Sequence, residues 1–505
     1  MNILKRIKYY AMIQPNHIAI QTDDALLTYR ELDRTSDLLA QYLERTCGTD
    51  TSPICVYGHK SPYMLICMLA CVKSGRAYCP IDISVPDIRT QSILDCVNAP
   101  LVFATESLEC ADTHRIELEE IKKIIQSESE GIEESHWVKG TDTFYIIFTS
   151  GSTGQPKGVQ ITADCLNHYL DWSIGLGISK EDKKDECFLN QAPFSFDLSV
   201  MDIYTSLASG SMLWTLSKEV QSDYKLLMQS LKVSNASIWV STPSFADICL
   251  SDKQFNGEWM PNLKAFLFCG ETLTPNTARR LQERFPSVKI VNTYGPTEST
   301  VAVTDVYITP RYVEANTSLP VGVAKPGTII EVRKANGCIA KDGEKGEIII
   351  LGDTVSTGYY KDSKTSENAF FIREVDGKMV RGYHTGDEGY LQDQMLYYCG
   401  RMDSQVKLHG YRIELEDIEQ NMMRLDTISK VVVLPNEKDG KVRSLSAYLV
   451  YKQKIEDRTK TMSLLKKQLK EFLPEYMIPK KFVFLEQLPL TVNGKIDRKQ
   501  LGGLA

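Results

Sequence analysis

The chain has 505 residues, of which 43% are hydrophobic and 24% are charged, and its formal net charge is −7. These proportions are typical of folded globular proteins and exclude disordered, collagen-like and disulfide-scaffold classes. At roughly 150 residues per domain, the length predicts two to four domains. The acidic charge does not favour polyanionic partners, so we expect neither nucleic-acid binding nor membrane insertion.

The first half of the chain alternates segments with the apolar patterns of strands and helices. The clearest helix signal is Thr28 as an N-cap with Glu31 three positions later, ahead of helically spaced apolar residues. This alternation predicts an α/β architecture built on doubly wound sheets. The predicted elements are strands at 18–22, 54–57 and 101–104 and helices at 27–43 and 62–73.

The location of the protein is indicated by what the sequence lacks. The N-terminal residues show no signal-peptide pattern, and the longest apolar run, at 64–72, is too short to span a bilayer. The 13 cysteines form no C-x-x-C pair and are typical of reduced thiols. We therefore expect a cytoplasmic protein.

Residues 144–162 read FYIIFTSGSTGQPKGVQIT, an apolar strand, a loop of small residues and a second strand. Backbone N–H groups and hydroxyls in such a loop approach phosphate oxygens closely, and Lys157 adds a positive charge. Lys157 precedes a glycine and a strand, which excludes the P-loop motif that runs from Gly-Lys-Ser/Thr into a helix. Taken alone, the loop is also typical of a flexible hairpin tip.

Near residue 400 the pattern changes from alternating α/β to a smaller α+β arrangement. We predict a domain boundary with a hinge at Asp403, a large domain at 1–402 and a small lobe at 403–505. The predicted elements of the lobe are helices at 414–425 and 462–473 and strands at 431–434 and 445–450.

Further motifs follow the loop in a fixed order along nearly the whole chain. Together with the loop, they resemble the adenylate-forming superfamily of acyl-CoA synthetases, firefly-type luciferases and amino-acid adenylation domains. The resemblance implies a large α/β N-terminal domain of several subdomains and a small, mobile α+β C-terminal lobe. The motifs are NQAPFSFDLSVMDIY at 190–204, FLFCGE at 266–271, NTYGPTEST at 292–300, GYHTGDEGY at 382–390, YCGRMDSQVKLHGYRIELEDIE at 398–419 and NGKIDR at 493–498.

The resemblance also implies a reaction in two steps that uses ATP and Mg²⁺. A carboxylate attacks the α-phosphorus of ATP to give an acyl-adenylate and pyrophosphate, and a thiol then expels AMP. The catalytic residues implied are Lys157 on the outer phosphates, Thr297 on the α-phosphate, Glu298 as the Mg²⁺ ligand and Lys495 between the substrate carboxylate and the α-phosphate.

The remaining nucleotide contacts implied by the resemblance surround the phosphates, ribose and adenine. Tyr294 would offer a face and Asn292 an amide to adenine, while Asp387 and Arg401 would hold the ribose. The other residues of this set are Ser152 and Thr153 on the phosphates, with Thr293, Gly295, Pro296, Tyr398, Cys399 and Gly400 alongside.

Within the superfamily, the motifs 192–204, 241–246 and 266–271 are most similar to ligases that load D-alanine onto a carrier protein. This similarity implies D-alanine as substrate, the phosphopantetheine thiol of a separate carrier as acceptor, and D-alanylation of teichoic acids as the pathway. Asp197 would bind the substrate ammonium, and Cys269 and Val301 would line the side-chain pocket together with Lys495 at the carboxylate.

Two alternatives to this function stay open from the residues. The protein could adenylate another small amino acid, or be an inactive paralogue that binds nucleotide as a scaffold. An acyl-CoA synthetase is disfavoured because its substrate needs no buried anion such as Asp197. Locally, Asp197 is also typical of a helix N-cap, and Cys269 of a buried structural thiol.

The assignment of Lys495 predicts that Lys495→Ala separates the two half-reactions. Loss of a transition-state contact of this kind typically costs on the order of 3 kcal/mol, so substrate-dependent pyrophosphate exchange should fall about a hundredfold or more. Transfer of a pre-formed acyl-adenylate to the carrier should persist. Equal loss in the exchange assay and the transfer assay would contradict the assignment.

Overall fold

The computed structural model describes residues 1–23, 25–109, 113–127, 131–151, 156–178, 185–315, 318–438, 441–452, 455, 457–489 and 496–503. The chain forms two compact units. The first contains residues 1–83, 94–148 and 158–402, and the second contains residues 84–93, 149–157 and 403–505. The longest segment of the second unit thus begins at Asp403.

The first unit contains a six-stranded sheet with the order β6-β5-β3-β4-β7-β8. The pairs β3–β4, β3–β5, β4–β7 and β5–β6 are parallel. Parallel strands need crossover connections, which explains the alternation of strand and helix patterns in the sequence. The strands are β3 (Ile54–Gly58), β4 (Tyr78–Asp82), β5 (Val102–Ala104), β6 (Arg115–Glu117), β7 (Thr143–Thr149) and β8 (Lys157–Thr162).

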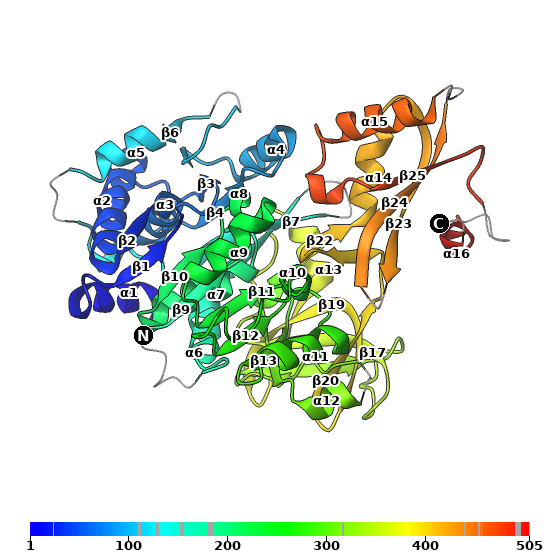
Figure 1. Ribbon diagram of the computed structural model, residues 1–505. Coiled ribbons are helices and arrows are strands. Elements are labelled where there is room, and N and C mark those ends of the chain that lie inside the picture. The colour runs from blue at the N-terminus through cyan, green and yellow to red at the C-terminus, as the bar shows by residue number, and fades with distance from the viewer. Residues whose placement is uncertain are drawn as a thin grey trace. The chain divides into compact units, whose positions relative to one another are not determined.

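A nine-stranded sheet with the order β15-β14-β13-β12-β11-β9-β10-β1-β2 is the larger layer of the same unit (Figure 1). It is parallel from β1 to β13 and ends in antiparallel strands at both edges. The strands are β1 (Ile18–Gln21), β2 (Leu26–Thr28), β9 (Cys187–Asn190), β10 (Met212–Thr215), β11 (Ile238–Ser241), β12 (Ala265–Phe268), β13 (Lys289–Tyr294), β14 (Thr304–Tyr307) and β15 (Val323–Ala324).

A third, antiparallel sheet of five strands completes the first unit. Its long strand β19 pairs with β17, β18 and β20, and Asp387 of β19 lies opposite Arg401 of β20 in the register. The strands are β16 (Thr328–Arg333), β17 (Gly346–Gly352), β18 (Phe370–Val375), β19 (Lys378–Gln392) and β20 (Met395–Arg401). The α/β class predicted from the sequence is confirmed.

Helices connect and cover the strands of this unit, and α4 runs across the division between the two units. They are α1 (Ile3–Ile13), α2 (Tyr29–Cys47), α3 (Pro62–Lys73), α4 (Asp87–Val97), α5 (Leu118–Ile124), α6 (Ala163–Ser173), α7 (Leu198–Ser209), α8 (Lys218–Ser222), α9 (Tyr224–Val233), α10 (Pro243–Cys249), α11 (Pro275–Arg284), α12 (Pro310–Glu314) and α13 (Ser363–Ala369), with 3-10 turns at Glu134–His136 and Thr297–Ser299.

The main hydrophobic core of the first unit joins the two parallel sheets. It combines buried side chains of β3, β7, β10 and β11 with those of α3, α6 and α7. Helix α3 is buried over nearly its whole length, which is why its sequence is apolar on every side. The predicted strands at 18–22, 54–57 and 101–104 and the helix at 62–73 are confirmed.

The start of α2 shows how local sequence fixes an element boundary. Thr28 accepts a hydrogen bond from the Glu31 backbone, and the Glu31 side chain accepts one from the Thr28 backbone, which together form a capping box. The helix therefore begins at Tyr29. The predicted cap at Thr28 is confirmed, whereas the predicted range began too early at residue 27, because Leu27 and Thr28 are extended and pair with β1.

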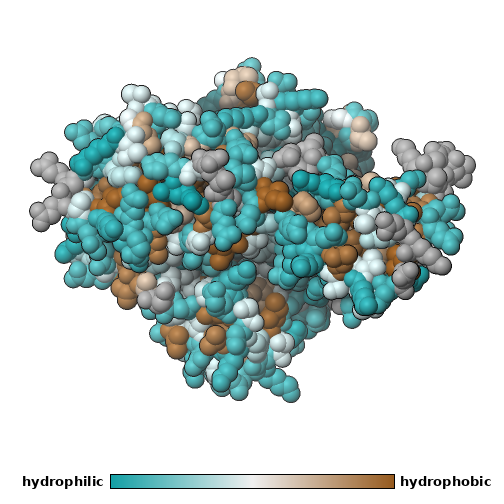
Figure 2. All heavy atoms as spheres, turned by 90° about the horizontal axis from the view of Figure 1, so that it is seen from above, coloured by the Kyte–Doolittle hydropathy of each residue, from teal (hydrophilic) through white to brown (hydrophobic). Residues whose placement is uncertain are grey.

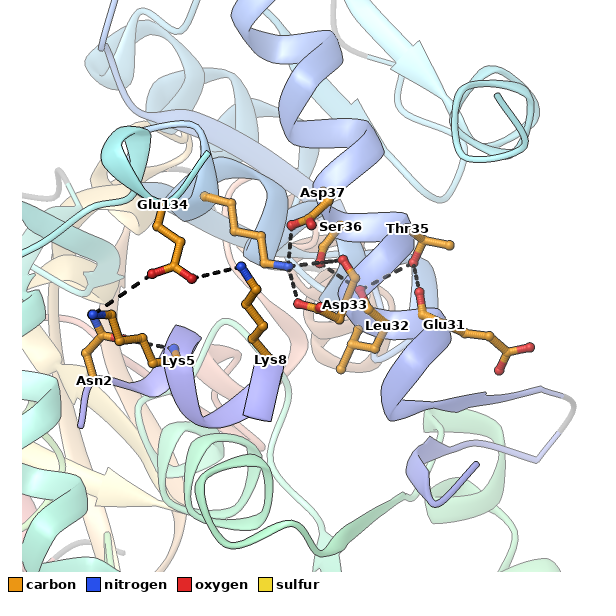
Figure 3. Close-up of polar contacts among 11 residues, drawn as sticks. Asn2, Lys5, Lys8, Glu31, Leu32, Asp33, Thr35, Ser36, Asp37 and Glu134 are labelled. Atoms are coloured by element: carbon orange, nitrogen blue, oxygen red, sulfur yellow. Dashed lines mark hydrogen bonds and ion pairs between the residues drawn. The ribbon is translucent and has the colours of Figure 1, made fainter. Parts of the chain in front are cut away.

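The buried Lys73 of α3 joins this helix to α2 through two ion pairs. The Lys73 ammonium lies 2.7 Å from carboxylate oxygens of both Asp33 and Asp37, which are one turn apart on α2. Figure 3 shows these two acids close to the Lys8–Glu134 ion pair that ties α1 to the first 3-10 turn. Because Lys73 is fully buried, this pairing is needed to offset the cost of its desolvation.

The second unit is an α+β assembly. Its three-stranded sheet has the order β23-β24-β25, with an antiparallel and then a parallel pair, and a separate two-stranded sheet joins β21 and β22. The elements of its C-terminal segment are β21 (Gln405–Leu408), β22 (Tyr411–Glu414), α14 (Leu415–Met423), β23 (Ile428–Lys438), β24 (Lys441–Tyr451), α15 (Arg458–Leu469), a 3-10 turn at Glu475–Met477, β25 (Lys481–Leu485) and α16 (Arg498–Gly502).

The predicted elements of this lobe are present, with shifted boundaries, of which those of α15 differ most: the helix begins at Arg458, four residues before the predicted start. Helix α15 begins after the Asp457 N-cap and ends at Leu469, four residues before the predicted end. Leu473, which the sequence pattern placed inside the helix, is still buried in the lobe core with Leu465 and Leu469. The apolar pattern extended the predicted helix too far, because Leu473 is buried although it lies beyond the end of the helix.

The surface agrees with the composition. On the face drawn in Figure 2, hydrophilic residues predominate and apolar residues appear in small groups. No helix in the described ranges combines the length and the apolar character that crossing a bilayer requires.

Lys60 is a second buried lysine of the first unit and connects its two parallel sheets. It follows β3, and its ammonium donates hydrogen bonds to the carbonyls of Gln191 (2.5 Å) and Leu216 (2.8 Å), just beyond β9 and β10. Burial lowers the pKa of Lys60 to about 7, and the carboxylates of Asp202 and Asp82 oppose this shift only in part.

The lowered pKa predicts a specific pH dependence of stability. Between the folded pKa and the unfolded value, the unfolded chain binds a proton that the folded chain does not, so stability rises with pH in this window. In Lys60→Met, which cannot titrate, the free energy of unfolding relative to wild type should therefore fall by about 1.4 kcal/mol per pH unit between roughly pH 7.5 and pH 10.

Urea denaturation at several pH values measures this difference. Lys225→Met, on the exposed side of α9, is the matched control and should follow the wild-type pH dependence. A pH-independent difference between Lys60→Met and wild type would contradict the prediction. In Lys60→Met, the carbonyls of Gln191 and Leu216 still accept hydrogen bonds from the Gln221 side-chain amide, so the substitution does not leave them unpaired.

Candidate active site

The predicted site residues of the first unit gather around the turn that follows β13. A 3-10 turn at Thr297–Ser299 leads into Thr300 and Val301, whose φ angles are 63° and 68°. Left-handed backbone is rare for β-branched residues and costs on the order of 1–3 kcal/mol at each position. Two such residues in succession mark the turn as a strained element that its surroundings hold in place.

Gly295 permits the close return of the chain after this turn. A Cβ atom at this position would lie 2.6 Å from the Cα atom of Ala302, closer than two carbons can approach. The Val303 N–H donates to the Tyr294 carbonyl at 2.8 Å, which closes the turn. The predicted Gly295 and Pro296 therefore shape the backbone that carries Thr297 and Glu298.

Asp197 and Thr297 are in direct contact, although they lie 100 positions apart. The Thr297 hydroxyl donates to an Asp197 carboxylate oxygen at 2.6 Å. Asp197 precedes α7 at the N-cap position but makes no side-chain capping bond. The alternative that Asp197 serves as a helix cap is therefore wrong, and its carboxylate is directed at the turn instead.

Glu298 has a fully buried side chain and a defined partner. The Tyr359 hydroxyl donates to one of its carboxylate oxygens at 2.8 Å, and the Ser356 N–H donates to its backbone carbonyl at 2.8 Å. A buried carboxylate is costly unless hydrogen bonds or a cation compensate it, and the Tyr359 hydroxyl supplies one such bond.

Asp387 forms a second polar cluster on the antiparallel sheet. One of its carboxylate oxygens accepts from the Tyr294 hydroxyl at 2.6 Å, and the other accepts from the Arg401 guanidinium at 2.9 Å. Burial, with the Asp387 charge beside it, raises the pKa of Tyr294 well above its ordinary value, so the phenol remains a donor. Arg401 also donates to the Thr385 carbonyl, which fixes the orientation of the guanidinium.

Aromatic and sulfur groups border this cluster. The rings of Tyr294 and Tyr398 lie 5.9 Å apart at an angle of 36°. Cys399 and Gly400 continue β20 toward Arg401, and partial burial raises the pKa of the Cys399 thiol. This raised pKa keeps Cys399 a neutral thiol at neutral pH.

Cys269 and Val301, the predicted pocket residues, are adjacent. The Cys269 thiol lies 3.6 Å from the Val301 carbonyl oxygen, to which it donates, and both residues are buried. Cys269 follows β12, while Val301 belongs to the strained turn. The turn therefore carries both Glu298 and Val301, the residue that Cys269 contacts.

Asn292 and Thr293 make structural bonds within the sheet. The Asn292 amide donates to the Pro320 carbonyl and the Thr293 hydroxyl donates to the Phe268 carbonyl, both at 2.8 Å. These bonds anchor the end of β13, from which Tyr294 and the turn extend.

The other predicted residues belong to the second unit or lie outside the described ranges. Lys157 is the first residue of β8, and Asp403 is exposed, with a carboxylate oxygen accepting from the Gln405 N–H. Ser152, Thr153 and Lys495 lie outside the described residues.

The side chains of the site can be compared with the ligands that the implied Mg²⁺ ion prefers. Glu298 offers a hard carboxylate oxygen, which suits Mg²⁺. In the described part of the chain, no three His, Cys, Asp or Glu side chains gather into a metal cage. Glu298 therefore fits the Mg²⁺ mode in which one or two carboxylates and substrate phosphates share the ion.

Tyr359 is a site residue that the sequence analysis missed. It lies in a Thr-Gly-Tyr-Tyr stretch at 357–360, outside the quoted motifs, and only the fold brings it to Glu298. A tyrosine beside glycine in a loop carries no signal of its own, so local reasoning could not have found it.

Comparison with known proteins now defines the class of this one. Residues 8–360 match the AMP-binding enzyme family, and residues 417–495 match the AMP-binding enzyme C-terminal domain. The chain belongs to the AMP-binding enzyme family, and it is a ligase that uses ATP.

Its relatives narrow the class further. The chain is 45% identical to the "D-alanine--D-alanyl carrier protein ligase" of Bacillus thuringiensis (strain Al Hakam) over 508 aligned residues, which cover 99% of both chains. The protein of the same name from Bacillus licheniformis is also 45% identical, over 505 residues and 99% of both chains.

Solved structures share the fold. Holo-PA1221, a protein with adenylation and PCP domains bound to a vinylsulfonamide inhibitor, has a TM-score of 0.84 and 26% identity over 99% of this chain and 84% of that one. The Vibrio cholerae adenylation domain AlmE, in complex with glycyl-adenosine-5'-phosphate, has a TM-score of 0.81 and 23% identity over 99% and 96%.

Proposed function

We propose that the protein activates D-alanine with ATP and transfers it to the phosphopantetheine thiol of a separate carrier protein. The observation that carries this proposal is the 45% identity, end to end, with D-alanine–D-alanyl carrier protein ligases. Holo-PA1221, which combines adenylation and PCP domains, supports a carrier as the acceptor.

The first step joins a carboxylate oxygen of D-alanine to the α-phosphorus of ATP and releases pyrophosphate. The product is a mixed anhydride, whose leaving group is AMP rather than oxide. In the second step the carrier thiol loses its proton and attacks the carbonyl carbon, the carbon–oxygen bond to AMP breaks, and a thioester remains.

The residues of the first unit suit the two substrates of the first step. We assign the D-alanine ammonium to Asp197, because the ammonium of an amino acid needs an anionic partner and this partly buried carboxylate does not cap α7. Thr297, bonded to Asp197, is assigned to the α-phosphate, and this contact would couple the two substrates. Asp387 and Arg401 are assigned to the ribose hydroxyls, since each carboxylate oxygen retains a second lone pair.

Mg²⁺ is part of the proposal, with Glu298 as its protein ligand. When bound, the ion would neutralise charge on the phosphates. Lys157, Ser152 and Thr153 are assigned to the outer phosphates, and Lys495 to the transition state, on the motifs in which they lie. Asp403 is the proposed hinge.

The proposed cellular role is D-alanylation of teichoic acids, with the reaction in the cytoplasm. Every cysteine that the structure describes has a free thiol, which agrees with a reducing compartment.

Pyrophosphate exchange with a panel of D-alanine, L-alanine, glycine and serine tests the proposed function. D-Alanine should support the fastest exchange of labelled pyrophosphate into ATP in the presence of Mg²⁺. Faster exchange with another amino acid would favour the alternative substrate, and ATP binding without any exchange would favour a nucleotide-binding scaffold. Either result contradicts the proposal.

The position of Cys269 predicts that its substitution changes the selectivity between D-alanine and L-alanine. Its thiol is fixed against the Val301 carbonyl, so the sulfur occupies space beside the substrate's methyl group in the proposed pocket. Removing an atom group of this size typically changes discrimination by 1–3 kcal/mol, so Cys269→Ala should raise L-alanine exchange relative to D-alanine by roughly tenfold. Cys249→Ala is the control, because this buried thiol belongs to a hydrophobic core separate from the one that contains Cys269. Unchanged discrimination in Cys269→Ala would exclude a role for this residue.

A further inference from the structure

One segment of the first unit contacts both the Glu298 turn and β8, the strand that directly follows the predicted phosphate loop. We call residues 354–360 the strap. It follows β17 and precedes α13, and its residues Thr354 and Ser356 are fully buried. None of the sequence motifs used to assign the site includes it.

Toward the turn, the strap makes three hydrogen bonds, each 2.8 Å long. The Thr300 hydroxyl donates to the Thr354 carbonyl, the Ser356 N–H donates to the Glu298 carbonyl, and the Tyr359 hydroxyl donates to the Glu298 carboxylate. The first bond restrains a left-handed residue, and the other two restrain the backbone and the side chain of Glu298.

Toward β8, the strap pairs like a short strand. The Gln160 N–H donates to the Gly358 carbonyl at 3.1 Å, and the Tyr360 N–H donates to the Gly158 carbonyl at 2.7 Å. The Ser356 hydroxyl also donates to the Gln160 carbonyl at 2.8 Å. The strap therefore connects the strand that leaves the predicted phosphate loop with the turn that carries Glu298.

Tyr359 is itself held at several points. Its N–H donates to the Ser366 hydroxyl at 2.8 Å, and its ring packs edge-on against Phe370 at 5.4 Å. The preceding Gly358 has a φ of 125°, and a Cβ atom there would lie 2.9 Å from the Ser366 hydroxyl oxygen. The phenol is thus pre-organised before any ligand binds.

We propose that Tyr359 is a positioning residue, which orients the Glu298 carboxylate for the metal ion that accompanies ATP. This inference rests on the proposed function, in which Glu298 holds Mg²⁺. The strap fixes the position of this carboxylate relative to β8, and Glu298 would hold a metal ion that neutralises phosphate charge. Without the phenol, Glu298 keeps its charge but loses one hydrogen bond that fixes the direction of its carboxylate.

Tyr359→Phe removes only the hydroxyl and keeps the ring on Phe370. Loss of one charge-assisted hydrogen bond should raise the Mg²⁺ concentration for half-maximal pyrophosphate exchange roughly tenfold. Calorimetric titration gives the readout besides activity: the gain in ATP affinity on adding Mg²⁺ should shrink, while ATP affinity without metal should match wild type. Tyr360→Phe is the matched control, because its hydroxyl lies against the Val97 carbonyl at 3.4 Å.

Two outcomes would overturn the inference. One is a wild-type Mg²⁺ requirement in Tyr359→Phe. The other is an equal loss of ATP affinity with and without metal, which a merely structural role would produce. A double-mutant cycle adds a check, since Tyr359→Phe should have no further effect on Mg²⁺-dependent ATP affinity in a Glu298→Gln background.

The design separates this inference from the proposed function. If wild-type protein shows no D-alanine-dependent exchange, the proposed function fails and the inference fails with it. If wild type exchanges normally and Tyr359→Phe has the same Mg²⁺ dependence, only the role of Tyr359 is lost.

Discussion

A buried carboxylate on a strained turn is the constraint around which the first unit is organised. Glu298 is fully buried, and the two left-handed residues Thr300 and Val301 follow within three positions. Both features cost free energy, so the turn persists only because neighbouring segments over-determine it. Those segments are β13, which leads into it, and the strap at 354–360, which bonds to it.

The same turn links the two halves of the proposed chemistry. Thr297 contacts Asp197 on one side of Glu298, and the Val301 carbonyl contacts Cys269 on the other. A change in the turn would therefore affect the proposed metal ligand, the proposed ammonium site and the proposed side-chain pocket together. This coupling offers a physical reason why one short segment carries so many of the assigned roles.

The polar cluster at Asp387 is held by contacts between two sheets rather than by a strained turn. It joins β13 of the parallel sheet to β19 and β20 of the antiparallel sheet through Tyr294 and Arg401. Because its two oxygens face donors from different sheets, Asp387 is fixed by the meeting of two layers rather than by its own strand. The proposed ribose contact is thus built on the junction between subdomains.

The sequence by itself determined the α/β class, the capped start of α2, the buried helix α3 and the family to which the chain belongs. These features follow from periodicity, capping residues and ordered motifs, each of which acts over a few positions. The sequence also nominated Glu298, Asp387 and Asp197. Only the tertiary structure decided that Asp197 accepts a hydrogen bond from Thr297 rather than capping its own helix. It also decided that the Tyr359 hydroxyl donates to the Glu298 carboxylate. These contacts join residues 100 and 61 positions apart, and no local pattern encodes a pairing that the packing of separate elements creates.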